Sequence, residues 1–158
     1  MIHEMKRIRT APNMDILLIG LPDQGLVRKL LLALKLGSRV RCCRNTKDAL
    51  PLLLSGKGGF FILEAGLGHN VCLKFFSRLL QNRPTYGALI GDSIEALLGV
   101  NALNSGLILD AMVRPVRAAA LTRALERYEV RRQRGGLTVL SSGFLPERIS
   151  ISDYHISM

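Results

Sequence analysis

The stretch FFILEAGLG, residues 60–68, is the part of the sequence that decides the fold. Four apolar residues lead directly into a single carboxylate, Glu64, and a small glycine-containing loop follows. A short continuous apolar run of this kind predicts a strand that is buried on both faces, as in a parallel sheet. Functional groups of such sheets collect at the carboxyl ends of the strands, so Glu64 is a candidate for chemistry.

Similar apolar runs occur along the rest of the chain, and amphipathic stretches separate them. Helical crossovers between short apolar strands predict a parallel sheet with helices on both faces. The expected fold is therefore α/β and doubly wound, a flavodoxin-like sheet of five parallel strands with five helices. The strands are expected at residues 14–20, 39–45, 60–64, 86–92 and 107–113, and the helices at 24–37, 46–56, 69–82, 93–106 and about 116–134.

Local signals place some ends and faces of these helices. Gly37 is expected to cap the end of the first helix, and Thr46 to cap the start of the second. In the last helix, the spacing of Leu121, Leu125 and Tyr128 predicts that these three side chains face the sheet.

The length and composition predict one domain. The chain has 158 residues, of which 48% are hydrophobic, and no apolar run reaches the roughly 20 residues that a membrane-spanning helix needs. With no signal-peptide pattern at its start, the chain is expected to be cytoplasmic, and Cys42, Cys43 and Cys72 are expected to be reduced thiols in or near the core. We expect an N-terminal extension at 1–13, the domain at 14–134 and a C-terminal extension or linker at 135–158, in which LTVL (137–140) could pair as an edge strand.

The charge is the unusual bulk property. Lysine and arginine number 22 against 12 acids, which gives a net charge of +10 and favours anionic partners. The loop GLPDQG after the first strand has neither the GxGxxG nor the Walker A spacing of nucleotide-binding loops. The three histidines are scattered without catalytic or metal-ligand spacing, so we expect neither an enzyme nor a bound cofactor.

Four segments, in this order and spacing, resemble bacterial response-regulator receiver domains of the CheY type. DILLIGLP is similar to the first strand of that family, FFILEAGLG to the third and ALIGD to the fourth, and NALNSGLILDAMVRPV is similar to the fourth helix and fifth strand. The resemblance covers about residues 14–130. It implies the receiver fold and a cis peptide bond between Arg114 and Pro115, where the family has Lys-Pro.

The positions that match the family's reactive residues differ from the family pattern. They are Gly20 and Leu21 for the acidic pair that holds Mg²⁺, Glu64 for the phosphoacceptor Asp, Ile90 for the switch Ser or Thr, Ala111 for the switch aromatic, and Arg114 for the Lys. Asp23 lies two or three residues late for the acidic pair. The resemblance therefore implies a degenerate pseudo-receiver, as found in hybrid histidine kinases, which takes no phosphoryl group.

Glu64 then has two interpretations. It could mimic a phosphorylated Asp by holding an extra negative charge in a fixed state, paired to Arg114. Alternatively, it is a relic that closes the strand end with an ion pair. We favour the second, because Ile90 has no hydroxyl that could take part in a switch.

The last helix carries arginines about one turn apart, at 123, 127, 131 and 134, which predicts a cationic stripe. Such a stripe could be a solvated surface, or it could bind phosphates and guanine edges, for which guanidinium groups are suited. Some pseudo-receivers of hybrid kinases bind cyclic di-GMP, so the resemblance makes this dinucleotide the expected ligand. The expected binding residues are Arg114, Pro115, Tyr128, Arg131, Arg132 and Arg134.

Three functions remain open on the sequence. The first is a regulatory module of bacterial signal transduction that controls a histidine kinase, with cyclic di-GMP as a possible ligand. The second is a protein-only adaptor that docks a kinase or another receiver domain. The third is nucleic-acid binding by the basic face, which is the weakest because aromatic residues make up only 5% and tryptophan is absent.

Overall fold

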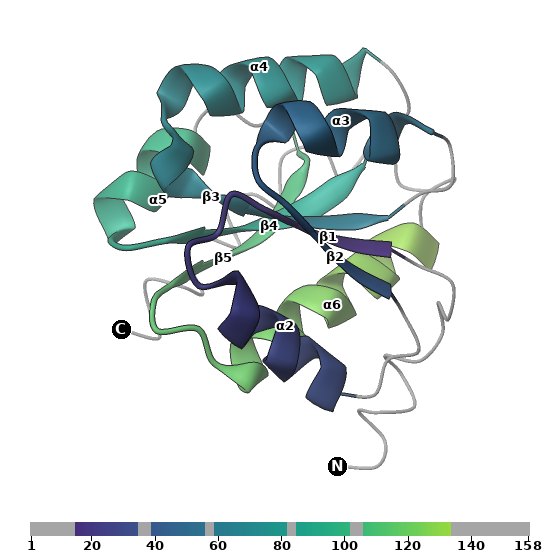
Figure 1. Cartoon of the computed structure of the whole chain (residues 1–158), viewed down its shortest axis with the longest axis vertical. Coiled ribbons are helices and arrows are strands. Elements are labelled where there is room, and N and C mark those ends of the chain that lie inside the picture. Colours follow the sequence, from purple (N-terminus) through teal and green to yellow (C-terminus); the bar gives the residue numbers. More distant parts are fainter. Residues whose placement is uncertain (1–14, 35–38, 56–58, 82–84, 102–105, 134–158) are drawn as a thin grey trace.

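The structure, a computed structural model, describes residues 15–34, 39–55, 59–81, 85–101 and 106–133. These residues form one sheet of five parallel strands in the order β2-β1-β3-β4-β5, which confirms the predicted doubly wound fold (Figure 1). The strands are β1 (Asp15–Ile19), β2 (Arg39–Cys43), β3 (Phe60–Glu64), β4 (Tyr86–Gly91) and β5 (Ile108–Val113).

The helices cover both faces of this sheet, as Figure 1 shows. On one face lie α2 (Gln24–Ala33) and α6 (Ala118–Gln133), and on the other lie α3 (Thr46–Leu54), α4 (His69–Leu80) and α5 (Ile94–Asn101). A short 3₁₀ turn, η1 (Ala65–Leu67), follows β3. In the part of the chain that the structure describes, no helix has the length and apolar character needed to cross a membrane. The expected cap at Gly37, the LTVL segment and both terminal extensions lie outside the described residues.

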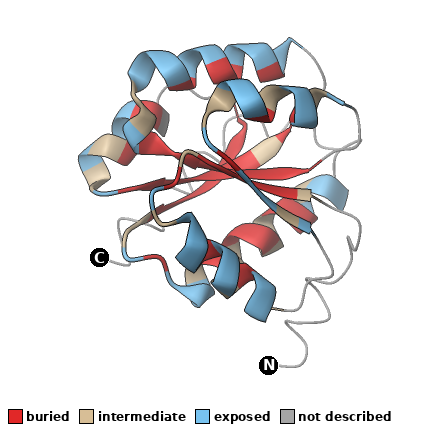
Figure 2. Cartoon of the chain, in the orientation of Figure 1, coloured by how far each residue is buried: buried red, intermediate tan, exposed pale blue. Residues whose placement is uncertain are grey.

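The core lies on both faces of the central strands, which are buried along almost their whole length (Figure 2). Leu121, Leu125 and Tyr128 of α6 are buried, as their spacing predicts. The Tyr128 ring meets the ring of Phe60 edge to face, with 5.1 Å between the ring centroids. Because Phe60 is the first residue of β3, this contact fixes the far end of α6 at the amino edge of the sheet.

Two local predictions were wrong. The residue that caps α3 is Asn45 rather than Thr46, and its Oδ1 accepts a hydrogen bond of 2.9 Å from the backbone N–H of Asp48. Cys42 is exposed, because successive side chains of a strand point to opposite faces and that of Cys43 takes the buried face of β2. The other two cysteines are buried as expected, all three thiols are free, and burial together with nearby Glu64 raises the pKa of Cys72 to about 11.

Gly87 allows β4 to approach the ring on β3. A Cβ atom added at this position would lie only 2.4 Å from both the Cδ1 and the backbone oxygen of Phe61. The backbone oxygen cannot move away, since it belongs to the neighbouring strand of the sheet. The packing of β4 against Phe61 of β3 therefore requires a residue without a side chain at position 87.

We predict that Gly87→Ala lowers the free energy of unfolding by about 3 kcal/mol, the upper part of the range for overpacked cores. Gly25→Ala is the matched control, because a Cβ at Gly25 of α2 meets nothing within 4 Å. That change should leave stability unaltered or raise it by up to about 1 kcal/mol. Urea unfolding of the two variants measures both effects, and equal stabilities would contradict this account of the strand packing.

Candidate functional site

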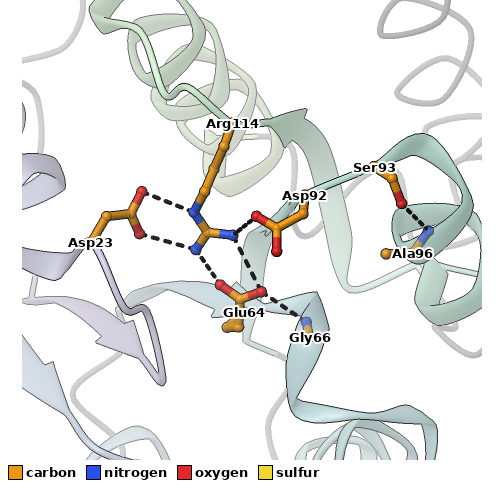
Figure 3. A network of polar contacts seen from close by, with 7 residues as sticks. All are labelled: Asp23, Glu64, Gly66, Asp92, Ser93, Ala96 and Arg114. Carbon is orange, nitrogen blue, oxygen red and sulfur yellow. Dashed lines mark hydrogen bonds and ion pairs between the residues drawn. The ribbon is translucent and has the colours of Figure 1, made fainter.

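Four charged side chains meet at the carboxyl edge of the sheet, and Arg114 lies at their centre (Figure 3). Arg114 follows β5 directly, Glu64 is the last residue of β3, and Asp92 follows β4. Asp23 comes from the loop that joins β1 to α2. We call these four residues the Arg114 cluster.

The guanidinium of Arg114 donates to all three carboxylates. Its Nε and Nη2 donate to the two oxygens of Asp23 at 2.9 and 3.0 Å, a bidentate pair. Its Nη1 donates to Oδ1 of Asp92 at 3.0 Å and to Oε2 of Glu64 at 3.4 Å, and its Nη2 also contacts Oε1 of Glu64. One cation thus joins the ends of four segments that are far apart in the sequence.

The backbone holds two members of the cluster in place. Oε2 of Glu64 accepts a hydrogen bond of 2.8 Å from the N–H of Gly66, so the side chain folds over the start of η1. The backbone N–H of Arg114 donates to the carbonyl oxygen of Gly91 at 2.9 Å. The bond from Arg114 to Pro115 is cis, which confirms the prediction from the resemblance.

Burial makes these contacts electrostatically strong. The side chains of Arg114 and Glu64 are only 16% and 7% exposed, whereas Asp92 is 82% exposed and contributes least. Burial alone would lower the pKa of Arg114, but the hydrogen bonds with Asp23 and Glu64 outweigh it and raise that pKa. The hydrogen bond with Arg114 lowers the pKa of Asp23 below its ordinary value. Arg114 and Asp23 are therefore both ionised near neutral pH.

Asp23 serves this cluster at the expense of its own helix. It is the N-cap residue of α2, but its side chain makes no capping hydrogen bond. A capping side chain is ordinarily worth about 1 kcal/mol to a helix. The tertiary ion pair with Arg114 has taken the place of the local cap.

The residues at this edge do not fit the Mg²⁺ that the resemblance implies. Gly20 has φ +70°, and a Cβ added there would lie 2.8 Å from Cδ1 of Leu67, so a leucine side chain covers the position of the family's acid. Leu21 is buried. Among the residues that the structure describes, no three His, Cys, Asp or Glu side chains are placed to hold a metal ion. The guanidinium, rather than a metal, stands between the carboxylates.

The positions that match the family's switch residues are apolar and fully buried. Ile90 of β4 pairs with Glu64 in the sheet register, and Ala111 of β5 pairs with Leu89. Neither side chain can form a hydrogen bond with a group at the carboxyl edge.

The expected cationic stripe on α6 is in part structural, because two of its arginines, Arg123 and Arg127, point to a buried acid. Asp110 of β5 is fully buried, and its Oδ2 lies 2.8 Å from Nε of Arg123. Nη1 of Arg127 lies 3.6 Å from the other carboxylate oxygen and donates to the carbonyl oxygen of Leu109 at 3.2 Å. Asp110 was not among the predicted site residues, although an acid inside the apolar run LILDAMV is a signal that it needs cationic partners.

The structure separates the expected ligand-binding residues into two groups. Arg114 and Pro115 lie at the carboxyl edge, whereas Tyr128, Arg131 and Arg132 lie near the amino edge, because α6 runs back along the sheet. There the guanidinium of Arg131 lies over the ring of Tyr86, 5.1 Å from its centroid, and Arg132 pairs with Glu129 at 2.7 Å. Arg134 lies outside the described residues.

Comparison with known proteins agrees with this architecture. Neither the known protein families nor the curated proteins give a sequence match to this chain. Among solved structures, a response regulator from Thermotoga maritima superposes with a TM-score of 0.60 at 15% identity, over 75% of this chain and 98% of the other. A response regulator receiver protein from Pseudoalteromonas atlantica gives 0.54 at 16% identity, over 78% and 98% of the two chains.

A third similar structure is a mutant of the anti-anti-sigma factor PhyR from Bartonella quintana. Its TM-score is 0.60 at 14% identity, over 81% of this chain and 53% of the other. At identities this low the likeness establishes the fold, and the fold is that of a receiver domain.

We predict that Arg114→Ala lowers the free energy of unfolding by about 3 kcal/mol, because it leaves the buried Glu64 carboxylate and that of Asp23 without their cation. Arg117→Ala is the control: it removes an exposed arginine three residues further on and should change stability by less than about 0.5 kcal/mol. Chemical denaturation near neutral pH measures both. A loss for Arg114→Ala no larger than for the control would show that the cluster does not hold the strand ends together.

Proposed function

We propose that this chain is a receiver-like regulatory module of bacterial signal transduction that is not phosphorylated, and that it acts by contact with other proteins rather than as an enzyme. The observation that carries the proposal is the Arg114 cluster. At the carboxyl edge of the sheet, where the resemblance implies a metal ion and a phosphoacceptor, a side-chain cation is already bound by three carboxylates.

This arrangement lacks what phosphoryl transfer requires. The reaction needs a metal ion and preorganised positive charge that is available to the phosphoryl oxygens. The donors of Arg114 are engaged by Asp23, Glu64 and Asp92, and the carboxylates outnumber the cation. An incoming phosphoryl group would therefore meet negative charge.

The same cluster supports a module with one fixed state. Glu64 is paired to Arg114 and held by the Gly66 N–H, and Ile90 offers no hydroxyl to rearrange. A domain of this kind is suited to act as a constant docking surface. We propose that it controls a histidine kinase or another domain of a two-component system. If it is instead a protein-only adaptor, the same domain would dock such a partner without binding a ligand.

We predict that the chain takes no phosphoryl group from acetyl phosphate in the presence of Mg²⁺. Intact-mass spectrometry should show no increase by one phosphoryl unit for the wild type. Glu64→Asp should also stay unmodified, because the shorter carboxylate still faces Arg114 and still lacks a metal.

A receiver domain with an intact acidic pair and phosphoacceptor, treated in the same experiment, serves as the positive control. A stable phosphoryl adduct on the wild-type chain would refute the pseudo-receiver proposal. An adduct on Glu64→Asp alone would show that the rest of the reactive site is intact and that only the acceptor has changed.

Cyclic di-GMP binding is a second candidate, and the contact between Arg131 and Tyr86 favours it. A guanidinium on an aromatic ring, beside Arg132, offers a planar cation on which a purine could stack. We propose this amino-edge group as the place where the dinucleotide would bind. Arg114 lies at the opposite edge of the sheet and would not contact a dinucleotide bound at the amino edge.

We predict that calorimetry at physiological salt shows tighter binding of cyclic di-GMP than of GTP or a short oligonucleotide. Arg131→Ala should weaken that binding by roughly tenfold, the value of one charged contact, and Arg114→Ala should not. Equal affinities for the three anions would show that the basic protein attracts anions non-specifically and has no site for cyclic di-GMP. If Arg114→Ala alone lowered the affinity for cyclic di-GMP, the dinucleotide would bind at the carboxyl edge instead.

A further inference from the structure

Among the described residues, no strand lies on the outer side of β2. It forms one edge of the sheet, and among the described residues its only strand partner is β1. The N–H of Gly20 donates to the carbonyl oxygen of Cys43 at 2.9 Å, so the backbone polar groups of Cys43 point toward β1. Because these groups alternate along a strand, the N–H and C=O groups of Val40 and Cys42 point outward. The outer side of β2 is therefore a template for another strand.

Basic side chains line this open edge. Arg39 and Arg41 are exposed on β2. Arg44 is exposed in the loop that follows, and Lys47 is exposed in the first turn of α3. Asp15 offsets part of this charge, at 3.2 Å from Arg39 and 3.9 Å from Arg41. Within the described part of the chain, the side chains of Arg44 and Lys47 have no acidic partner. We call the segment 39–47 the β2 edge.

A depression of about 830 Å³ opens at the carboxyl end of this edge. Cys42, Arg44 and the acidic Asp48 form part of its wall, and Leu21 and Leu52 supply apolar surface. A strand of another protein that paired with the outer side of β2 would continue into this depression and could place one side chain in it. Edge pairing of this kind obtains affinity from main-chain hydrogen bonds and specificity from such pockets.

We propose that the β2 edge binds an acidic segment of a partner protein as an added strand. Arginines on an open edge repel the same edge of a second copy, so the charge argues against self-pairing. An acidic strand removes that repulsion and places its carboxylates across from Arg41 and beside Arg44, where cross-strand pairs of opposite charge are favourable. Binding at the β2 edge does not depend on whether the carboxyl edge can take a phosphoryl group.

The test uses the full chain of 158 residues and a fluorescein-labelled peptide of about eight residues that alternates Glu and Val. Fluorescence anisotropy should show saturable binding that weakens as salt is added. The same peptide, N-methylated at alternate residues on its pairing side, keeps its charge but cannot donate to β2. It should bind at least about tenfold more weakly.

Two protein variants locate the site. Val40→Pro removes an outward N–H and leaves the β1–β2 hydrogen bonds intact, so it should weaken peptide binding at least about tenfold. Arg44→Gln should weaken it by several fold, whereas Lys74→Gln, an equal loss of charge on α4, should not. Hydrogen exchange at Val40 and Cys42 should slow when the peptide is bound. This measurement and the N-methylated peptide test the wild type even if Val40→Pro does not fold.

Several outcomes would overturn the proposal. Equal binding of the plain and the N-methylated peptide would mean that only charge is recognised. Recognition of charge alone would also follow if Arg44→Gln and Lys74→Gln lowered the affinity for the peptide equally. It would follow as well if an oligonucleotide of the same charge bound as tightly as the peptide. Dimerisation that Val40→Pro abolishes would identify a second copy of the chain as the occupant of the edge, and absence of saturable binding would leave the edge without this role.

Discussion

The guanidinium of Arg114 is the contact on which the carboxyl edge of this protein depends. It joins β5 to the β1–α2 loop and to the ends of β3 and β4, with Asp23, Glu64 and Asp92 as its partners. Breaking a buried ion pair costs more than forming it contributes, because the remaining charge has no water to solvate it. An edge built in this way is hard to rearrange. Rigidity at the place where related folds carry a reactive group is the physical basis for the proposed regulatory role.

A second ion cluster lies between β5 and α6, and it changes how the net charge of the chain is interpreted. The buried Asp110 is compensated by Arg123 and Arg127, which secures α6 against β5. A net charge of +10 therefore does not describe a uniformly basic surface, because several arginines are structural. Among the described residues, the β2 edge gathers exposed cations within a short segment, at Arg39, Arg41, Arg44 and Lys47. The β2 edge is therefore a better candidate than the last helix for contact with an anionic partner.

The fold was predictable because it rests on local patterns that the chain repeats. The run at Phe60–Glu64 was predicted to its last residue, since an apolar strand between glycine-containing loops has few other readings. Helix ends were less predictable: α3 is capped by Asn45 although Thr46 is also a capping residue type, and only backbone geometry decides between neighbours. The alternation of basic and small apolar residues in RVRCC is typical of an edge strand, and β2 does lie at the edge of the sheet.

The sequence alone determined that the chain alternates strands and helices and that Glu64 ends a buried strand, and it predicted that the positions matching a receiver's reactive residues carry other residue types. These are properties of spacing and residue type. Only the tertiary structure decided which charges meet: that Asp23, two or three residues away from the expected position, reaches Arg114 across 91 residues of chain, and that Asp110 takes two arginines of the last helix. Ion pairs between distant segments leave no periodic trace in a sequence, because their partners are brought together by strand order rather than by spacing along the chain.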